Sequence, residues 1–248
     1  LRATPTGAKT HVAHRSESGS RREARQSAVR SLRALGRDRT FILLTLLLAG
    51  YWFLWAQINI SVPLAAIQLE GLAQGPKLAA LAFAINAGPA ILFQYPLVRV
   101  LGPRYPARLL LAISIGLCGM AMALVFATPL VPVFLAGIVL FALARMLIGP
   151  LINVVTADMA PAGMLGAYFG FGALSVALGA GGGQYIGGFL YDIATRQHLP
   201  IALWGTLLAV GIGGALGVSR LRLPAYAVSA KPDEDEIEDA TRRASSSI

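Results

Sequence analysis

Six long apolar segments dominate the chain, and each approaches or exceeds the length that a helix needs to cross a bilayer. They lie at roughly 41–66, 79–98, 108–127, 131–154, 165–190 and 200–219. The hydrocarbon core of a membrane takes about 20 apolar residues as a helix. Hydrophobic residues make up 56% of the sequence and charged residues only 13%, whereas soluble domains carry about 25% charged residues. The sequence therefore predicts an all-α membrane protein with six transmembrane helices.

The positive charge of the chain is unevenly distributed. The net charge is +9, and ten of the 21 Lys and Arg residues lie in 1–40. Lys and Arg gather on the cytoplasmic side of membrane proteins. One side would hold the basic segment and Arg99, Arg104, Arg108, Arg220 and Arg222, and the other side only Lys77 and Arg196. We expect a multi-pass protein of the cell (inner) membrane with both ends of the segment in the cytoplasm.

Three regions follow from this pattern. Residues 1–40 are predicted to be a basic cytoplasmic loop or tail, 41–219 a six-span transmembrane domain, and 220–248 a disordered cytoplasmic tail. Within the first region, 21–37 alternates arginines with apolar residues at helical spacing. That pattern fits a basic helix lying on anionic lipid, and it fits a solvated linker equally well. No recognition motif accompanies the charge, so we expect no nucleic-acid partner.

Polar and aromatic side chains within the spans indicate a path for a small molecule. Trp52, Trp55 and Asn59 are spaced i, i+3 and i+7, so one helix would present them on one face. They can line a cavity or form an aromatic belt at the interface, and their depth favours the cavity. The other polar candidates inside the spans are Asn86, Gln94 and Gln184.

Arg145 is the one charged residue expected deep inside a span. Intramembrane charges are costly and mark functional sites. The side chain can snorkel toward the membrane surface, or it can face a cavity and bind a carboxylate or another anionic group. The spans at 41–66, 79–98 and 108–127 contain no Asp or Glu to pair with it.

The stretch ALGAGGGQYIGGFLYD at 177–192 raises the question of a phosphate-binding loop. Such a loop ends in Gly-Lys-Ser/Thr after a strand, whereas here no lysine follows and both flanks are apolar. Gly179, Gly183 and Gly187 are instead spaced by four, which lets a neighbouring helix approach closely in a membrane. We therefore expect a close helix crossing.

Metal, cofactor and hydrolytic chemistry have no support in the sequence. Cys118 is the only cysteine, and the histidines are His11, His14 and His198, which is no metal-ligand set. The spans hold no Gly-x-Ser-x-Gly and no acidic cluster. We expect no metal, no cofactor and no enzymatic activity.

The order of these features resembles the C-terminal half, spans seven to twelve, of a major facilitator superfamily transporter, over most of residues 20–222. A long basic segment precedes the first span, as the central cytoplasmic loop does in that family. The polar spans are the first, second, fourth and fifth, and the plain third and sixth spans are expected to face lipid. The stretch PLVRVLGPR at 96–104 is similar to the family's Gly-x-x-x-Asp-Arg-x-Gly-Arg-Arg loop, with Arg99 in place of the Asp and with Gly102 and Arg104 retained.

Two later stretches extend the resemblance. Residues 154–171 look like the family's loop and following helix, with Asp158 at the membrane end and Leu165 where the family has Arg. Residues 178–192 are similar to the glycine-rich span of drug–proton antiporters, so the chain most resembles bacterial drug-efflux members. The sequence begins with Leu1 rather than Met, as a fragment of a longer protein would.

The resemblance implies that 41–219 form a six-helix half-bundle, or half-domain, of that family's fold. It also implies secondary active transport, with efflux of a small molecule by alternating access. The implied partners are an N-terminal six-span half of the same transporter, the small-molecule substrate and membrane lipids, with proton coupling through carboxylates located elsewhere. A non-transporting six-span scaffold or partner subunit is the alternative. An ABC-type permease subunit is a third reading, but the loops at 99–107 and 156–164 are short for its coupling helix.

Overall fold

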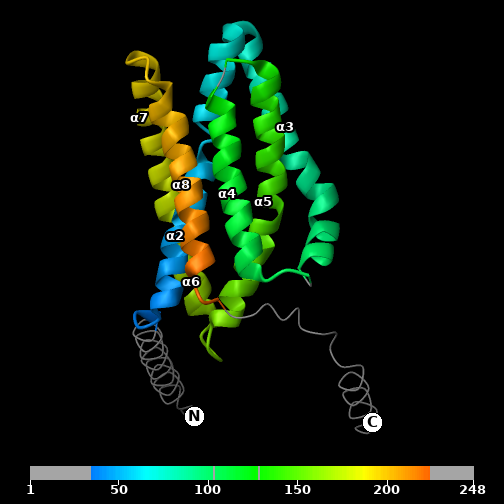
Figure 1. Cartoon of the computed structure of the whole chain (residues 1–248), viewed down its shortest axis with the longest axis vertical. Helices are drawn as coiled ribbons and strands as arrows, with labels where there is room; N and C mark the ends of the chain where they lie inside the picture. Colours follow the sequence, from blue (N-terminus) through cyan, green and yellow to red (C-terminus); the bar gives the residue numbers. More distant parts are fainter. Residues whose placement is uncertain (1–34, 103, 128, 224–248) are drawn as a thin grey trace, which may run out of the picture.

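The computed structural model describes residues 35–102, 104–127 and 129–223, and every regular element in these ranges is helical. The elements are α2 (Arg39–Ala56), α3 (Ser61–Leu101), α4 (Ala107–Ala127), α5 (Val131–Met159), α6 (Leu165–Val176), the π-helix η1 (Ala177–Gly181), α7 (Gly182–Arg196) and α8 (Pro200–Arg220). They run up and down as one bundle (Figure 1). The predicted all-α membrane fold is confirmed.

Five helical stretches in the described part are long and apolar enough to cross a membrane. The first, Arg39–Ala90, takes in both α2 and most of α3 and contains a reversal of the chain. Gly71 has φ 73° and ψ 178° inside α3, and a Cβ built on Gly75 would lie 2.5 Å from the Cα of Ile67. Residues eight apart in a straight helix are about 12 Å apart, so the chain turns back here. The spans expected at 41–66 and 79–98 lie on the two arms of this reversal (Figure 1).

A second break separates α2 from α3. Residues 57–60 form a turn rather than a helix. Proline in a helix removes one hydrogen bond, and its ring clashes with the carbonyl four residues earlier. Pro63 stands four residues after Asn59, so it opposes helix at this place. The Gln57 side chain fills the break: its Nε2 donates to the Phe53 carbonyl at 3.0 Å, and its Oε1 accepts from Ser61 Oγ at 2.6 Å.

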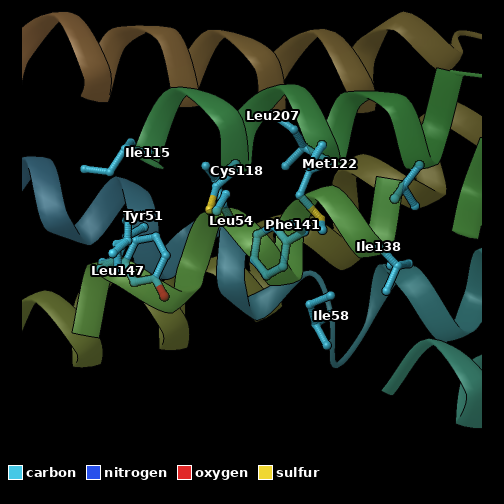
Figure 2. Packing of buried hydrophobic residues seen from close by; sticks show 14 of the residues in the cluster. Tyr51, Leu54, Ile58, Ile115, Cys118, Met122, Ile138, Phe141, Leu147 and Leu207 are labelled. Carbon is cyan, nitrogen blue, oxygen red and sulfur yellow. The ribbon is translucent and has the colours of Figure 1, made fainter. Parts of the chain in front are cut away.

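The core of the bundle is built around α4, which packs against α5 and α8. Figure 2 shows Cys118 and Met122 of α4 beside Phe141 of α5 and Leu207 of α8, and all four are fully buried. Within an apolar 18-residue segment of α4, 61% of the residues are buried. The small and branched side chains of α4 thus serve as the packing surface for two neighbours. Leu109, Ile113 and Met120 of the same helix are exposed, and the expectation that this span faces lipid stays a prediction.

The crossing of α4 and α8 is the closest approach in this core. A Cβ built on Gly119 would lie 2.5 Å from the Cα of Gly211, and one built on Gly211 would meet the Cα of Gly119 in return. One turn away on each helix, Gly116 faces Ala215 with 3.3 Å between their Cβ positions. Small residues on both faces let the two backbones touch.

Most of the expected basic segment at 1–40 and of the tail at 220–248 lies outside the described residues, and so does most of the candidate interfacial helix at 21–37. Leu35 is within the described part and is buried against Phe41 and Tyr168.

Candidate functional site

The two tryptophans of α2 form the aromatic part of the predicted substrate path. Trp52 and Trp55 pack edge to face with ring centroids 5.6 Å apart, and the Trp52 ring also lies 5.1 Å from that of Tyr51. Both tryptophans are partly buried. Edge-to-face pairing is a favoured aromatic arrangement, so the pair forms a fixed apolar surface with one exposed side.

Asn59 does not share the helical face of the tryptophans. α2 ends at Ala56, and Asn59 lies exposed in the following turn. The predicted spacing of i, i+3 and i+7 assumed an uninterrupted helix, and that assumption is wrong. The sequence contained a sign of this helix break, because Pro63 opposes a helix at Asn59.

Arg145 lies midway along α5, about 21 Å from either end of the helix at 1.5 Å per residue. Its guanidinium turns sideways to α3, where Nη1 donates to the backbone carbonyl of Asn86 at 3.5 Å. Tyr51 of α2 is a near neighbour and packs beside Leu147 (Figure 2). The arginine thus joins three helices at mid-depth.

Asn86 supplies an unused acceptor beside this arginine. The residue is buried, and its Oδ1 has no hydrogen-bond partner within the described part of the chain. An unpaired buried polar atom costs about 1–3 kcal/mol, so such atoms point to a partner that is absent from the fold itself. Pro89 lies three residues farther on in α3, where the backbone cannot form a regular hydrogen bond.

The remaining path candidates are scattered. Gln94 is half-buried on the outer arm of α3, and Gln184 is exposed on α7. Neither side chain makes a hydrogen bond within the described ranges. The structure therefore brings Arg145 and Asn86 together, but it does not gather all the predicted residues around one point.

The three glycines spaced by four face α2. A Cβ on Gly179 would meet the Ala49 carbonyl and, at 2.6 Å, the Trp52 Cβ, and one on Gly183 would lie 2.9 Å from the Phe53 Cα. A Cβ on Gly187 would meet the Gln57 amide. Gln57 Nε2 also donates to the Gly183 carbonyl at 3.0 Å. These positions hold the backbone of α7 directly against α2.

The glycine face begins within a π-helix. η1 interrupts the helical path between α6 and α7 at Ala177–Gly181 and includes Gly179. Single π turns inside α-helices are often found at functional sites. The π turn changes the phase of the helix, so the residues of α6 and α7 that face α2 do not follow one continuous α-helical repeat.

Three of the four residues expected in the cytoplasmic connections are on the surface. Arg99, Arg104 and Asp158 are exposed, and Gly102 is buried and donates its backbone N–H to the Val98 carbonyl at 2.9 Å. None of these side chains takes part in an ion pair among the described residues, where the recorded pair is Arg196 with Asp192.

A polar contact at this end of the bundle was missed by the sequence reasoning. Asp38 caps α2 by accepting from the Phe41 N–H at 3.0 Å, and its other oxygen accepts from the Tyr168 hydroxyl at 2.9 Å. The Phe41 and Tyr168 rings lie 4.5 Å apart. An Asp immediately before an apolar run signals a helix start, but its partner is 130 residues away.

The described residues contain no group of three or more His, Cys, Asp or Glu side chains that would hold a metal ion. The arrangement therefore consists of an apolar aromatic surface, a half-buried arginine beside an unused amide oxygen, and tight glycine crossings. Aromatic rings and an arginine can bind the apolar and polar parts of a small molecule.

Comparisons with known proteins agree with the helical membrane fold described above. A family model described as Major Facilitator Superfamily matches residues 5–184. The protein named Multidrug resistance protein MdtH from Edwardsiella ictaluri (strain 93-146) is 31% identical over 179 residues, which is 71% of this chain and 43% of that protein. The protein of the same name from Escherichia coli (strain K12 / DH10B) is 30% identical over 183 residues, with the same shares covered.

The chain thus covers 43% of the length of these relatives. A match over most of the chain, an all-helical fold and several membrane-spanning helices agree with one another. The chain belongs to the Major Facilitator Superfamily.

Proposed function

We propose that the chain is one six-span half, the C-terminal one, of a twelve-span secondary transporter that exports small amphipathic molecules by alternating access. The observation that carries this proposal is the unequal burial of the helices. Within an apolar 18-residue segment of Leu165–Arg196 only 17% of the residues are buried, whereas 61% are buried in such a segment of α4. Gln184 and Tyr185 are exposed there, Tyr185 by 84%. Polar side chains exposed on a membrane helix need a protein partner or a water-filled cavity.

The partner in this proposal is an N-terminal six-span half, and the exposed faces of α2 and α7 would border the path between the halves. Both ends of the chain would lie in the cytoplasm, because the arginines at 99, 104, 108 and 220 share one end of the bundle. Proton coupling would use carboxylates of the other half. The name of the relatives, Multidrug resistance protein MdtH, supports drug-like substrates.

Flux measurements on tryptophan variants test the path. A fluorescent amphipathic substrate would be added outside inverted vesicles that carry the full-length protein, and its uptake into the vesicles compared between Trp55→Ala and Trp204→Ala on α8. We expect Trp55→Ala to lower flux by about tenfold, the loss of about 1.4 kcal/mol of binding, because it removes half of the aromatic pair. Trp204→Ala removes a membrane tryptophan outside the path and should leave flux unchanged.

Arg145 provides a second arm of the test. Arg145→Lys keeps the charge and loses the planar fork, and Arg145→Gln loses both. A path role predicts lower flux for Arg145→Gln at normal membrane abundance. Wild-type flux in Trp55→Ala and in Arg145→Gln would rule out the assigned path, and absence of any flux in the unmodified protein would favour a scaffold.

A further inference from the structure

A cavity of about 520 Å³ lies at the end of the bundle that carries the α4–α5 and α7–α8 turns, which is the upper end in Figure 1. Its walls come from the start of α3, the end of α4, the end of α7 and the start of α8. None of the path candidates Trp52, Trp55, Arg145 and Gln184 lines it. Small-molecule pockets measure about 300–1,000 Å³, so this cavity has the size of a ligand site.

The apolar wall of the cavity is formed by α4 and α8. Val125 and Leu203 are buried, and Phe126 is partly buried beside them. Branched and aromatic side chains in a fixed core provide a preformed apolar surface. A ligand that rests on this wall removes apolar area from water at about 25 cal/mol per Å².

The opposite wall carries hydrogen-bonding groups from α3 and α7. The Tyr191 hydroxyl donates to Gln68 Oε1 at 2.7 Å, which fixes the side-chain amide at the cavity. The two Nε2 hydrogens of Gln68 have no partner among the described residues. Thr195 donates its hydroxyl hydrogen to the backbone, with the Tyr191 carbonyl 2.9 Å away, so its oxygen retains acceptor capacity. The wall therefore offers amide donors next to hydroxyl acceptors.

The cavity lining contains no Asp, Glu, Lys or Arg. The closest arginine along the chain, Arg196, is 78% exposed at its side chain and pairs with Asp192. A phosphate group is usually bound by Arg or Lys, and an organic cation by a carboxylate or an aromatic cage. His198 also lines the cavity, but it is exposed to solvent. The lining offers no arginine or lysine for phosphate and no carboxylate for a cation, so it favours an uncharged ligand.

We propose that this cavity is a second binding site, separate from the substrate path, for an uncharged amphiphilic small molecule. The apolar part of the ligand rests on Val125, Phe126 and Leu203. A carbonyl or ether oxygen of the ligand accepts from the Gln68 amide, and a ligand hydroxyl or N–H donates to Thr195. The proposal concerns binding alone and does not depend on transport.

Protection of an introduced cysteine tests the site directly. Ala194 lines the cavity, and the native Cys118 is fully buried. The full-length Ala194→Cys variant would be labelled with a fluorescent maleimide in lipid nanodiscs, and labelling of the unmodified protein would be subtracted. The probes are chloramphenicol, an uncharged aromatic amide, and tetraphenylphosphonium, an aromatic cation. At a probe concentration about ten times the dissociation constant, chloramphenicol should slow labelling about tenfold, and tetraphenylphosphonium should leave it unchanged.

Tyr191→Phe in the same background examines the polar wall. It keeps the ring and removes the hydroxyl that fixes Gln68. The chloramphenicol concentration that halves the labelling rate should then rise about three- to tenfold, which corresponds to the loss of one hydrogen bond. The matched control is Tyr105→Phe, because Tyr105 is exposed in the connection between α3 and α4 at the other end of the bundle.

Three outcomes would overturn the proposal. The first is labelling that neither probe slows, and the second is equal protection by the cation. The third is protection by phospholipid added to delipidated protein without any protection by chloramphenicol, which would identify a lipid site. Loss of flux in the tryptophan variants has no bearing on these results, so the two proposals fail independently.

Discussion

Replacing Gly119 by alanine should destabilise the bundle, because the α4–α8 crossing leaves no room for a methyl group. The new carbon would lie 2.5 Å from the Gly211 Cα, 3.1 Å from the Gly211 nitrogen and 3.2 Å from the Leu207 carbonyl oxygen. All three atoms belong to backbone, so no side chain can rotate away. Carbon atoms in contact prefer about 3.5–4.0 Å, so the helices must separate by about 1–1.5 Å.

The magnitude follows from two opposing effects. Overpacking a closely packed core costs about 1–3 kcal/mol, and alanine in place of glycine favours helix by up to about 1 kcal/mol. A net loss of about 1–2 kcal/mol is expected. In a protein of this size each kcal/mol shifts Tm by about 2–4 °C, so Gly119→Ala should lower Tm by about 2–8 °C.

The single cysteine of the sequence provides the assay. Cys118 is fully buried on α4, so a thiol-reactive fluorophore reports the opening of this helix on heating in detergent. Gly213→Ala on α8 is the matched control, because a Cβ there has no atom within 4 Å. We expect Gly213→Ala to keep or raise Tm. If Gly119→Ala and Gly213→Ala shifted Tm equally, the reasoning from the crossing would be refuted.

Three further predictions concern contacts elsewhere in the bundle. Tyr168→Phe should cost about 1.5–3 kcal/mol, the value of a hydrogen bond to a charged group. Asp38→Ala should add about 1 kcal/mol to it in the double variant when thermal unfolding is followed, because it also removes the cap of α2. Gly187→Ala should lower Tm because the methyl displaces a buried amide, whereas Gly188→Ala, with its nearest atom at 3.9 Å, should not. Arg196→Gln breaks an exposed ion pair and should change the free energy of unfolding by less than about 1 kcal/mol in chemical denaturation.

The helices themselves could be predicted from the sequence because hydrophobic length alone defines a membrane span. The apolar run at 108–127 corresponds to α4 (Ala107–Ala127), and the run at 200–219 to α8 (Pro200–Arg220). The ends were less certain where a helix continues past the apolar region, as α5 does to Met159. Polar residues at a span's end can remain helical outside the hydrocarbon, so hydropathy underestimates the helix.

Contacts between helices were harder to foresee. Nothing local in the sequence pairs Gly119 with Gly211, because a small residue permits a close approach without selecting its partner. The Tyr168–Asp38 hydrogen bond has the same non-local character. Asn59 is different: Pro63 was visible, and its effect on the carbonyl four residues earlier would have predicted the break.

The glycine face of α7 also determines which side chains the chain presents to its surroundings. Gly183 and Gly187 lie against α2, which fixes the rotation of α7 about its own axis. Successive residues of a helix are about 100° apart, so Tyr185, two positions after Gly183, is turned by about 200° and must point away from α2. That side chain is 84% exposed. A larger residue at position 183 would rotate or displace α7 and move Tyr185 and Gln184 with it, so a change on the packed side of this helix would be transmitted to its exposed side.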